Sequence, residues 1–295
     1  MKYFFCIDGG ETKSIAILYD SDGKILSKSK SGSGNSFNDV HNVEKNIILL
    51  WSNCCKKAKL NKNKIQLHTI ASFGLAGIKL DKSRKYLKRK INFFKKLILS
   101  SDGFIALAGT SITKSVAVLN IGTGVVAHLI ANNYSQQLSG WGFPYGDKGG
   151  GWWIGFRLVQ ETLKSKDEYV KKDSLTKKVL QILGGEDSKI LTSLSNLKPN
   201  KLAELTQVFF NHKKKSKIFK SIMKEGVSEI EEIIKYMIDE KKINKIYFTG
   251  GLSKSYLPFI QKKYLNHIIC NQTDPLYGAF LIAKGKFPYE KSKNK

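Results

Sequence analysis

The hydrophobic and polar positions at the start of the chain form short apolar runs separated by polar turns. Residues 3–7 and 15–19 are apolar runs of strand length, rich in β-branched and aromatic side chains. They flank Asp8–Ser14, whose Gly9-Gly10 pair predicts a tight hairpin. A turn at Asp20–Gly23 and a third strand over residues 24–30 follow. The pattern predicts a meander of three antiparallel strands.

Beyond the meander, helices and strands alternate. The expected elements are a helix capped by Asn38-Asp39 and running to about Lys59, a buried strand over residues 65–75, a basic helix from Asp81, a strand over 96–100 and a small-residue helix over 104–109. A meander followed by this alternation is typical of an α/β fold with a mixed sheet.

The pattern then starts again. Residues 115–120 and 125–130 are strands around the tight turn Gly122-Thr123-Gly124, and a third strand follows at 134–138. The rest is mostly helical over 151–240, with a strand at 244–249 running into Gly250-Gly251 and a closing helix from Asp274. A second glycine-tipped hairpin indicates a duplicated domain. We expect domains at 1–112 and 113–295, with the last helix, about 274–286, packing back on the first.

The bulk composition is that of a globular protein. The chain has 295 residues, 41% hydrophobic and 25% charged, enough for two cores. No apolar run approaches the roughly 20 residues that span a bilayer, and Asp8 interrupts any signal peptide too early. These features predict a cytoplasmic protein without membrane contact. The four cysteines, which have no metal-site spacing, are interpreted as reduced, small core residues.

The net charge of +26 suggests nucleic acid as a partner, but its distribution argues against one. The excess is almost all lysine and is spread along the chain, without an arginine-rich patch interleaved with aromatic residues. A solvated lysine surface is the favoured interpretation. A positive field can also steer an anionic substrate such as ATP.

Two sequence features carry candidate chemistry. The first hairpin would expose backbone N–H groups at its tip, which suits a polyphosphate, and Asp8 offers the hard oxygen ligand that Mg²⁺ prefers. An ordinary glycine-rich turn is the alternative. Asp102 follows a strand and precedes small residues, where a carboxylate suits a general base. Capping of the following helix is the other role that Ser101-Asp102 suits.

Motifs along nearly the whole chain point to one family. They are, in order, Ile7-Asp8-Gly9-Gly10-x-Thr12, Gly74-Leu75-Ala76-Gly77, Ser101-Asp102-Gly103, Ile121-Gly122-Thr123-Gly124, Gly140-Trp141-Gly142, Gly146-Asp147-x-Gly149-Gly150-Gly151-x-Trp153-Ile154-Gly155 and Thr249-Gly250-Gly251. In their order and spacing, these motifs resemble those of the acetate and sugar kinase/Hsc70/actin superfamily. Within it they are most similar to the BadF/BadG/BcrA/BcrD-type ATPases, specifically glucosamine and N-acetylglucosamine kinases.

The resemblance implies two ribonuclease-H-like, actin-like ATPase domains with mixed five-stranded sheets and an interdomain cleft. It implies ATP and Mg²⁺ as cofactors, an amino sugar phosphorylated on its 6-hydroxyl, and a homodimer. By the same resemblance, the expected residues are Asp102 as the base; Gly9, Gly10, Thr12, Lys13, Gly122, Thr123 and Gly124 at the phosphates; Gly250, Gly251 and Ser253 at the adenosine; Asn35, Gly77, Asp102, Trp141, Gly142 and Asp147 at the sugar; and Asp8 and Asp147 at the metal.

Four positions depart from the family pattern. Glu11 stands where Gly, Ser or Ala is usual, Ile121 and Val125 flank the second loop where relatives often carry Ser, and Lys148 stands where Glu or Gln is common. Two alternatives stay open. One is an activator ATPase of a 2-hydroxyacyl-CoA dehydratase type system, although its cysteine cluster ligands are missing. The other is a non-catalytic ATP- or sugar-sensing module.

Overall fold

The computed structural model describes residues 1–131, 134–212, 216–270, 273–288 and 290. The chain forms two compact units. Unit 1 comprises Met1–Val116, Asn132–Ser135 and Thr273–Lys295, and unit 2 comprises Ala117–Ala131 and Gln136–Gln272. The last segment of the chain therefore belongs to the same unit as the first.

Unit 1 is built on a five-stranded sheet in the order β3-β2-β1-β4-β5. The strands are β1 (Tyr3–Gly9), β2 (Ser14–Tyr19), β3 (Ile25–Ser31), β4 (Thr69–Leu75) and β5 (Lys96–Ser100). The meander of β1 to β3 is antiparallel, whereas β4 pairs in parallel with both β1 and β5. The predicted mixed sheet is confirmed.

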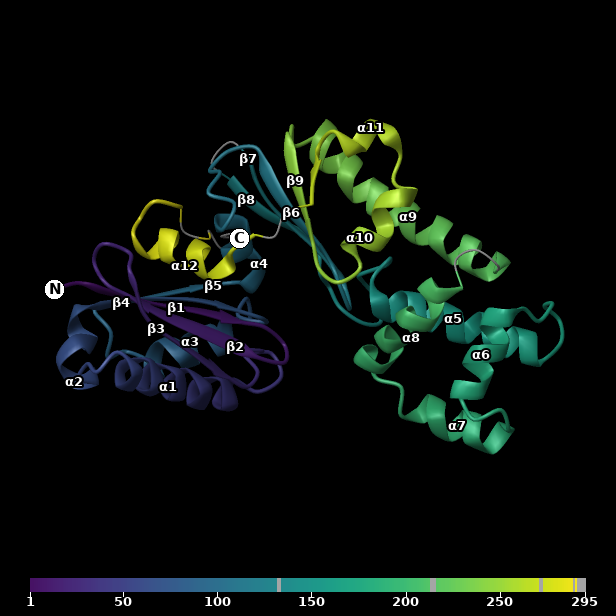
Figure 1. Cartoon of the computed structure of the whole chain (residues 1–295), viewed down its shortest axis with the longest axis horizontal. Helices are drawn as coiled ribbons and strands as arrows, with labels where there is room; N and C mark the ends of the chain where they lie inside the picture. Colours follow the sequence, from purple (N-terminus) through teal and green to yellow (C-terminus); the bar gives the residue numbers. More distant parts are fainter. Residues whose placement is uncertain (132–133, 213–215, 271–272, 289, 291–295) are drawn as a thin grey trace. The chain divides into compact units, whose positions relative to one another are not determined.

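Helices cover both faces of this sheet (Figure 1). They are α1 (Val40–Lys57), α2 (Lys62–Ile65), the 3₁₀ turn η1 (Gln66–His68), α3 (Asp81–Lys90), α4 (Asp102–Ala108) and α12 (Pro275–Ala283). Side chains alternate along β1, so Phe5 meets Trp51 of α1 at 5.0 Å between ring centroids, and Phe4 meets Phe280 of α12 at 5.3 Å. Burial on both faces explains why the first strand is a continuous apolar run.

Unit 2 repeats the strand order of unit 1. Its strands are β6 (Val116–Ile121), β7 (Val125–Ala131), β8 (Tyr134–Ser139), β9 (Lys245–Thr249) and β10 (Ile268–Ile269), arranged β10-β9-β6-β7-β8. The first strand of each sheet is central, with its hairpin partner on one side and a later strand on the other. This identity of order confirms the duplication and the two mixed five-stranded sheets.

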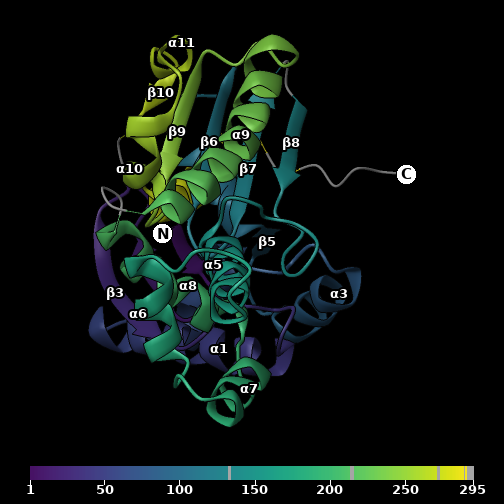
Figure 2. The same ribbon diagram turned by 90° about the vertical axis from the view of Figure 1, so that its right-hand side faces the viewer.

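The helices of unit 2 mostly lie between β8 and β9 in the sequence. They are α5 (Gly151–Lys166), α6 (Ser174–Ile182), α7 (Asp187–Ser195), α8 (Pro199–Asn211), α9 (Lys217–Asp239), α10 (Ser253–Tyr256), the 3₁₀ turn η2 (Leu257–Phe259) and α11 (Lys262–Leu265). The long α9 lies across one face of the second sheet (Figure 2). Its Ile230, Ile234 and Met237 join the same hydrophobic core as Leu119 and Ile246 from the strands.

Two sequence expectations are wrong in detail. The strand expected from residue 65 begins at Thr69, because the Asn61 side chain accepts hydrogen bonds from the N–H groups of Asn63 and Lys64 and starts a helical segment that ends at His68. Cys270 is exposed because it follows the two-residue edge strand β10, whereas the other three cysteines are buried as expected. Within the described ranges, no helix has both the length and the apolar character to cross a membrane.

Candidate active site

In unit 1, the predicted residues gather where three neighbouring strands end. Asp8 of β1 is opposite Gly74 of β4, and Gly74 is opposite Ser100 of β5. The three strands run in parallel, so their carboxyl ends lie at one edge of the sheet. Asp102 follows Ser100 by two residues, so the carboxylates of Asp8 and Asp102 both lie at this edge. One strand, β4, separates β1, which carries Asp8, from β5, which leads to Asp102.

The first phosphate loop is the β1–β2 hairpin, and it packs tightly against the loop before α1. Gly34 N–H donates to the carbonyl of Gly10 at 2.9 Å, and Ala76 N–H donates to the carbonyl of Gly9 at 2.9 Å. A Cβ on Gly34 would overlap the Cα of Gly9. Glycine is therefore required where these two backbones meet, and the pair fixes the base of the loop.

The tip of the hairpin is open to solvent. Gly10 N–H donates to the carbonyl of Lys13 at 3.0 Å, which closes the turn. Glu11, Thr12 and Lys13 are all exposed. The unusual Glu11 is thus a solvent-facing residue of the turn, and the described contacts give it no structural role in unit 1.

Asn35 and Gly77 lie beside each other in unit 1. A Cβ on Gly77, whose φ is +71°, would lie 2.9 Å from Asn35 Oδ1. That oxygen accepts a hydrogen bond from Phe37 N–H at 3.0 Å, so Asn35 makes an Asx turn. This turn orients the Asn35 amide next to Gly77.

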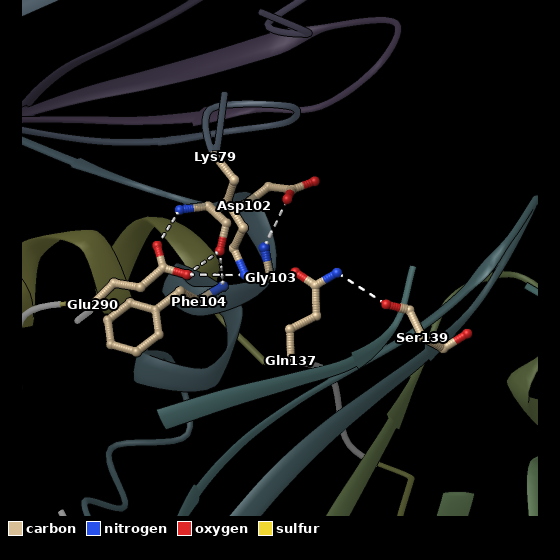
Figure 3. A network of polar contacts seen from close by, with 8 residues as sticks. Lys79, Asp102, Gly103, Phe104, Gln137, Ser139 and Glu290 are labelled. Atoms are coloured by element: carbon tan, nitrogen blue, oxygen red, sulfur yellow. Dashed lines mark hydrogen bonds and ion pairs between the residues drawn. The ribbon is translucent and has the colours of Figure 1, made fainter. Parts of the chain in front are cut away.

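Asp102 is the first residue of α4, and Ser101 is its N-cap. Phe104 N–H donates to Ser101 Oγ at 3.3 Å, whereas Asp102 Oδ1 accepts from Gly103 N–H at 2.9 Å (Figure 3). The capping role thus falls to Ser101, one residue earlier than Asp102. Burial raises the pKa of the Asp102 carboxyl, and the hydrogen bond from Gly103 opposes that rise.

Asp8 titrates far from its usual range. Its pKa is raised to about 6, chiefly by burial and next by the charge of Asp102, while Lys13 lowers it and Asp274 raises it. The negative charges of Asp8, Asp102 and Asp274 are only partly balanced by the positive charge of Lys13, and this imbalance favours a bound cation. The donor chemistry of this edge therefore fits a hard divalent ion such as Mg²⁺, which takes carboxylate and water oxygens.

In unit 2, the second glycine turn is fastened to the start of α5. Gly122 N–H donates to the carbonyl of Gly124 at 2.9 Å, and the loop carbonyls of Gly122 and Thr123 accept from the N–H groups of Gly151 at 2.8 Å and Trp152 at 2.9 Å. The expected tight turn is present. Its flanking residues Ile121 and Val125 are fully buried, so these apolar side chains belong to the core of unit 2.

Asp147 packs directly on this second loop. A Cβ on Gly124 would overlap Asp147 Oδ2, and the Asp147 backbone has a φ of +61°. Burial raises the pKa of Asp147, opposed by hydrogen bonds from the backbone of Gly142 and Gly140. Oδ1 is buried and has no hydrogen-bond partner among the described residues. An unpartnered buried carboxylate oxygen fits a cation or a water held by one.

Trp141 differs from the other tryptophans of the motif region. It is 85% exposed, next to Gly142, whose φ is +78°. Trp152 and Trp153 are buried in the core of unit 2. An exposed indole between two glycines is an available stacking surface, whereas the buried pair holds α5 in place.

The residues expected at the adenosine lie after β9. Gly250 has a φ of +89°, and a Cβ there would overlap the carbonyl oxygen of Ile121. A Cβ on Gly251 would meet no atom within 4 Å, so this residue borders open space. Ser253 Oγ donates to the carbonyl of Gly250 at 2.8 Å. The Ser253 hydroxyl therefore holds the turn closed.

Sequence reasoning missed Glu290, Lys79 and Glu229, three polar residues near these positions. Glu290 accepts hydrogen bonds from Ser101 and pairs with Lys79, immediately beside Asp102. Lys148, the departure next to Asp147, pairs with Glu229 of α9 at 3.0 Å. Neither contact has a sequence signal, because the partners are separated by long stretches of chain and belong to no motif.

Comparison with known proteins identifies the family. The model of the BadF/BadG/BcrA/BcrD ATPase family matches residues 6–283. The chain belongs to the BadF/BadG/BcrA/BcrD ATPase family. The matched range includes both glycine hairpins, Asp102 and the Gly250-Gly251 turn. The family membership that the sequence motifs predict is therefore confirmed.

Two named sugar kinases are similar to the chain over nearly its whole length. The glucosamine kinase GspK of Vibrio cholerae is 21% identical over 96% of this chain and 96% of its own length. The N-acetylmuramic acid/N-acetylglucosamine kinase of Clostridium acetobutylicum is 26% identical over 97% of this chain and 99% of its own. The chain therefore matches amino-sugar kinases from end to end.

Solved structures show the same fold. A candidate N-acetylglucosamine kinase from Chromobacterium violaceum superposes with a TM-score of 0.85 at 21% identity, covering 96% of this chain and 99% of that one. A ROK family glucokinase from Streptomyces griseus, solved with glucose and AMPPNP, gives 0.52 at 11% identity, over 96% and 99% of the two chains. These similarities confirm the actin-like fold of two domains.

Proposed function

We propose that the protein is an ATP-dependent amino-sugar kinase that transfers the γ-phosphoryl group of ATP to the 6-hydroxyl of glucosamine or N-acetylglucosamine. The observation that carries this proposal is Asp102, a partly buried carboxylate of raised pKa just after a strand end within an ATPase family. The amino-sugar substrates are those in the names of the full-length relatives.

In the proposed reaction, Asp102 accepts the proton of the sugar hydroxyl as that oxygen attacks the γ-phosphorus. The bond from the γ-phosphorus to the β–γ bridging oxygen breaks, and ADP leaves. A general base is most effective when its pKa lies near the working pH. Burial moves the Asp102 pKa in that direction, because a charged carboxylate is disfavoured away from water. The Gly103 N–H fixes the orientation of the carboxylate.

The two glycine hairpins are the proposed phosphate-binding elements. Gly9 and Gly10 with Thr12 and Lys13 form the first, and Gly122 to Gly124 form the second. Exposed backbone N–H groups and the Lys13 ammonium offer donors and positive charge to a polyphosphate. Gly250, Gly251 and Ser253 are the proposed adenosine contacts, supported by the open space at Gly251.

Asp8 and Asp147 are the residues that we propose hold Mg²⁺. When bound, Mg²⁺ neutralises charge on the phosphates of ATP. Asp8 suits this role because burial, and after it the nearby carboxylates, raise its pKa, a cost that a cation relieves. Asp147 suits it because its Oδ1 has no partner among the described residues. Among the described residues there is no group of three or more His, Cys, Asp or Glu side chains suited to a metal ion. Mg²⁺ is usually bound by one or two carboxylates, with water and phosphate oxygens completing its coordination.

The sugar-binding residues and the domain division are also proposals. We retain Asn35, Gly77 and Asp102 in unit 1 and Trp141, Gly142 and Asp147 in unit 2 as the sugar contacts. The adjacency of Asn35 with Gly77 and the exposure of Trp141 support them. The boundary between residues 112 and 113, the homodimer and the cytoplasmic location remain predictions.

The two alternative functions have weaker support. An activator ATPase would need accessible thiolates for its cluster, and Cys6, Cys54 and Cys55 are buried with raised pKa values. A sensing module would have no need of a partly buried carboxylate of raised pKa just after the strand end.

An ADP-release assay across a sugar panel tests the proposed function. Glucosamine, N-acetylglucosamine, N-acetylmuramate and glucose are each offered with Mg-ATP. We expect turnover with an amino sugar well above the sugar-free ATPase rate, and a product phosphorylated at the 6-position by NMR. Folded protein that binds ATP but turns over no sugar would exclude the kinase proposal and favour the sensing module. Iron-free, colourless protein would exclude the activator ATPase.

A further inference from the structure

The segment after α12 in unit 1 returns to the helix that carries Asp102. Ser101 N–H donates to Glu290 Oε2 at 2.7 Å, and Ser101 Oγ donates to Glu290 Oε1 at 2.8 Å (Figure 3). One carboxylate therefore binds both polar groups of the residue immediately before Asp102. Charge-assisted bonds of this kind are about twice as strong as neutral ones.

This pair of contacts restricts the chain at the start of α4. The bond to Ser101 N–H fixes the plane of the preceding peptide, and the bond from Ser101 Oγ fixes the rotamer of the serine. The Ser101 hydroxyl oxygen also accepts a hydrogen bond from Phe104 N–H, so a lone pair of this oxygen is directed into the first turn of α4. Asp102 lies between these fixed points, and Glu290 thereby limits the directions in which its side chain can point.

Anchoring the end of the chain does not by itself require a charged residue here. Phe287, three residues before Glu290, is buried against Phe104 of α4 with ring centroids 5.8 Å apart. The Glu290 side chain is only 8% exposed and lies near a second carboxylate, Asp102. Burying a carboxylate beside another is unfavourable. A role that depends on the carboxylate explains why it is there.

Lys79 offsets part of this unfavourable charge. Its ammonium lies 3.6 Å from Glu290 Oε1 and is half exposed. Glu290 raises the pKa of Asp102 and Lys79 lowers it, so the two side chains act on the same carboxyl in opposite directions. Lys79 follows β4, Glu290 follows α12 and Asp102 begins α4, so three elements meet at this one carboxylate.

We propose that Glu290 is a positioning residue for Asp102: its carboxylate holds Ser101 and thereby orients the catalytic carboxylate toward the sugar hydroxyl. The proposal rests on the proposed function, because it assigns Glu290 a role in the same proton transfer. Glu290 itself touches neither substrate nor ATP in this scheme.

A double-mutant cycle tests the proposal. We expect Glu290→Ala to lower kcat about 10-fold while the KM values for sugar and ATP stay within about twofold, since oriented groups lose rate when they are misplaced. In an Asp102→Asn background the same change should have no further effect on the residual rate, because Glu290 acts through Asp102. A merely structural residue would lower the rate equally in both backgrounds, and that result would overturn the proposal.

Glu290→Gln keeps the test valid if the alanine variant fails to fold. Glutamine has the same length but one acceptor oxygen, so it can accept only one of the two Ser101 bonds, and we expect an intermediate loss of kcat. The matched control is Glu204→Gln, which removes a charge from the exposed Lys201–Glu204 pair in unit 2 and should change neither constant. An unchanged kcat in Glu290→Gln and Glu290→Ala would refute the role of Glu290.

The failure of this inference is distinguishable from failure of the proposed function. If wild-type protein turns over no sugar, the kinase proposal fails. If wild-type protein is active, Asp102→Asn is inactive and both Glu290 variants are fully active, only the positioning role fails.

Discussion

Asp8 and Asp102 lie at the same edge of the first sheet, and the charge of Asp102 raises the pKa of Asp8. Two partly buried carboxylates that influence each other are unfavourable unless a cation or a proton relieves them. The different roles that we propose for them, Asp8 as a metal ligand and Asp102 as the general base, follow from their surroundings. Lys13 lies close enough to lower the pKa of Asp8, whereas Asp102 is held by Gly103 and lies beside Glu290.

The Mg²⁺ requirement should depend on Asp8. With Asp8→Asn we expect the Mg²⁺ concentration for half-maximal activity to rise by about 10-fold or more, since even outer-sphere changes at metal sites have effects of that size. The stabilisation by Mg²⁺ in thermal unfolding should shrink as well. Thr12→Ser, in the same loop, is the control, because it leaves every carboxylate in place. Equal Mg²⁺ responses in wild type and Asp8→Asn would show that Asp8 is no metal ligand.

The pH dependence of kcat should report the charges around Asp102. The base must be deprotonated, so kcat falls as pH drops through its raised pKa. Glu290→Gln removes a negative charge that raises this pKa, so the acid limb should move to lower pH. Lys79→Met removes a positive charge that lowers it, so the limb should move to higher pH. Asp8, Asp274 and Lys13 are the other charged groups at this edge, and both variants retain them.

Shifts of the acid limb toward the same pH direction in the two variants would contradict this account. The comparison uses initial rates at saturating sugar and Mg-ATP from pH 4 to 8, with Glu204→Gln as the control for general charge effects.

The contact of Gly34 with Gly9 should make the first hairpin intolerant of side chains. Gly34→Ala places a Cβ on the Gly9 backbone, so we expect unfolding free energy to fall by about 1–3 kcal/mol through overpacking. Gly10→Ala is the matched control in the same turn, because its Cβ would make only an ordinary contact, 3.7 Å from the Lys13 carbonyl oxygen. Urea unfolding measures both. Equal losses would mean that the close approach of Gly34 has no energetic consequence.

Trp141 and Trp152 should respond in opposite ways to truncation. Trp141→Ala removes an exposed indole, so we expect the unfolding free energy to stay within about 0.5 kcal/mol while the KM for the sugar rises several-fold. Trp152→Ala creates a core cavity and should reduce the unfolding free energy by about 3–5 kcal/mol. Urea unfolding and sugar-dependent initial rates separate the two effects. An unchanged sugar KM in Trp141→Ala would remove this residue from the sugar site.

Much of the fold was predictable because its signals are local. The apolar runs on either side of Asp8–Ser14 and of Gly122-Thr123-Gly124 identify both hairpins, and their repetition predicts the duplicated sheet order that the structure has. The start of β4 was missed because residues 65–68 are apolar enough for a strand, while the Asn61 cap that makes the segment helical acts from outside it.

The candidate site was predictable only where residues belong to motifs. Asp8, Asp102 and Asp147 adjoin glycines whose spacing is recognisable in the sequence. Glu290 and Lys79 have no such context, because the register of β4 and β5 and the return of the chain after α12 bring them to Ser101. Contacts of this kind depend on tertiary packing, which no local pattern encodes.

The most direct test of the central claim compares wild type with Asp102→Asn on the best sugar of the panel. Initial rates give kcat, and isothermal titration gives the affinities for sugar and Mg-ATP. The account predicts that kcat falls by about 10²–10⁴, the usual contribution of a general base, while both affinities stay within about threefold. A variant that keeps wild-type kcat would contradict the assignment of Asp102 as the base that activates the sugar hydroxyl.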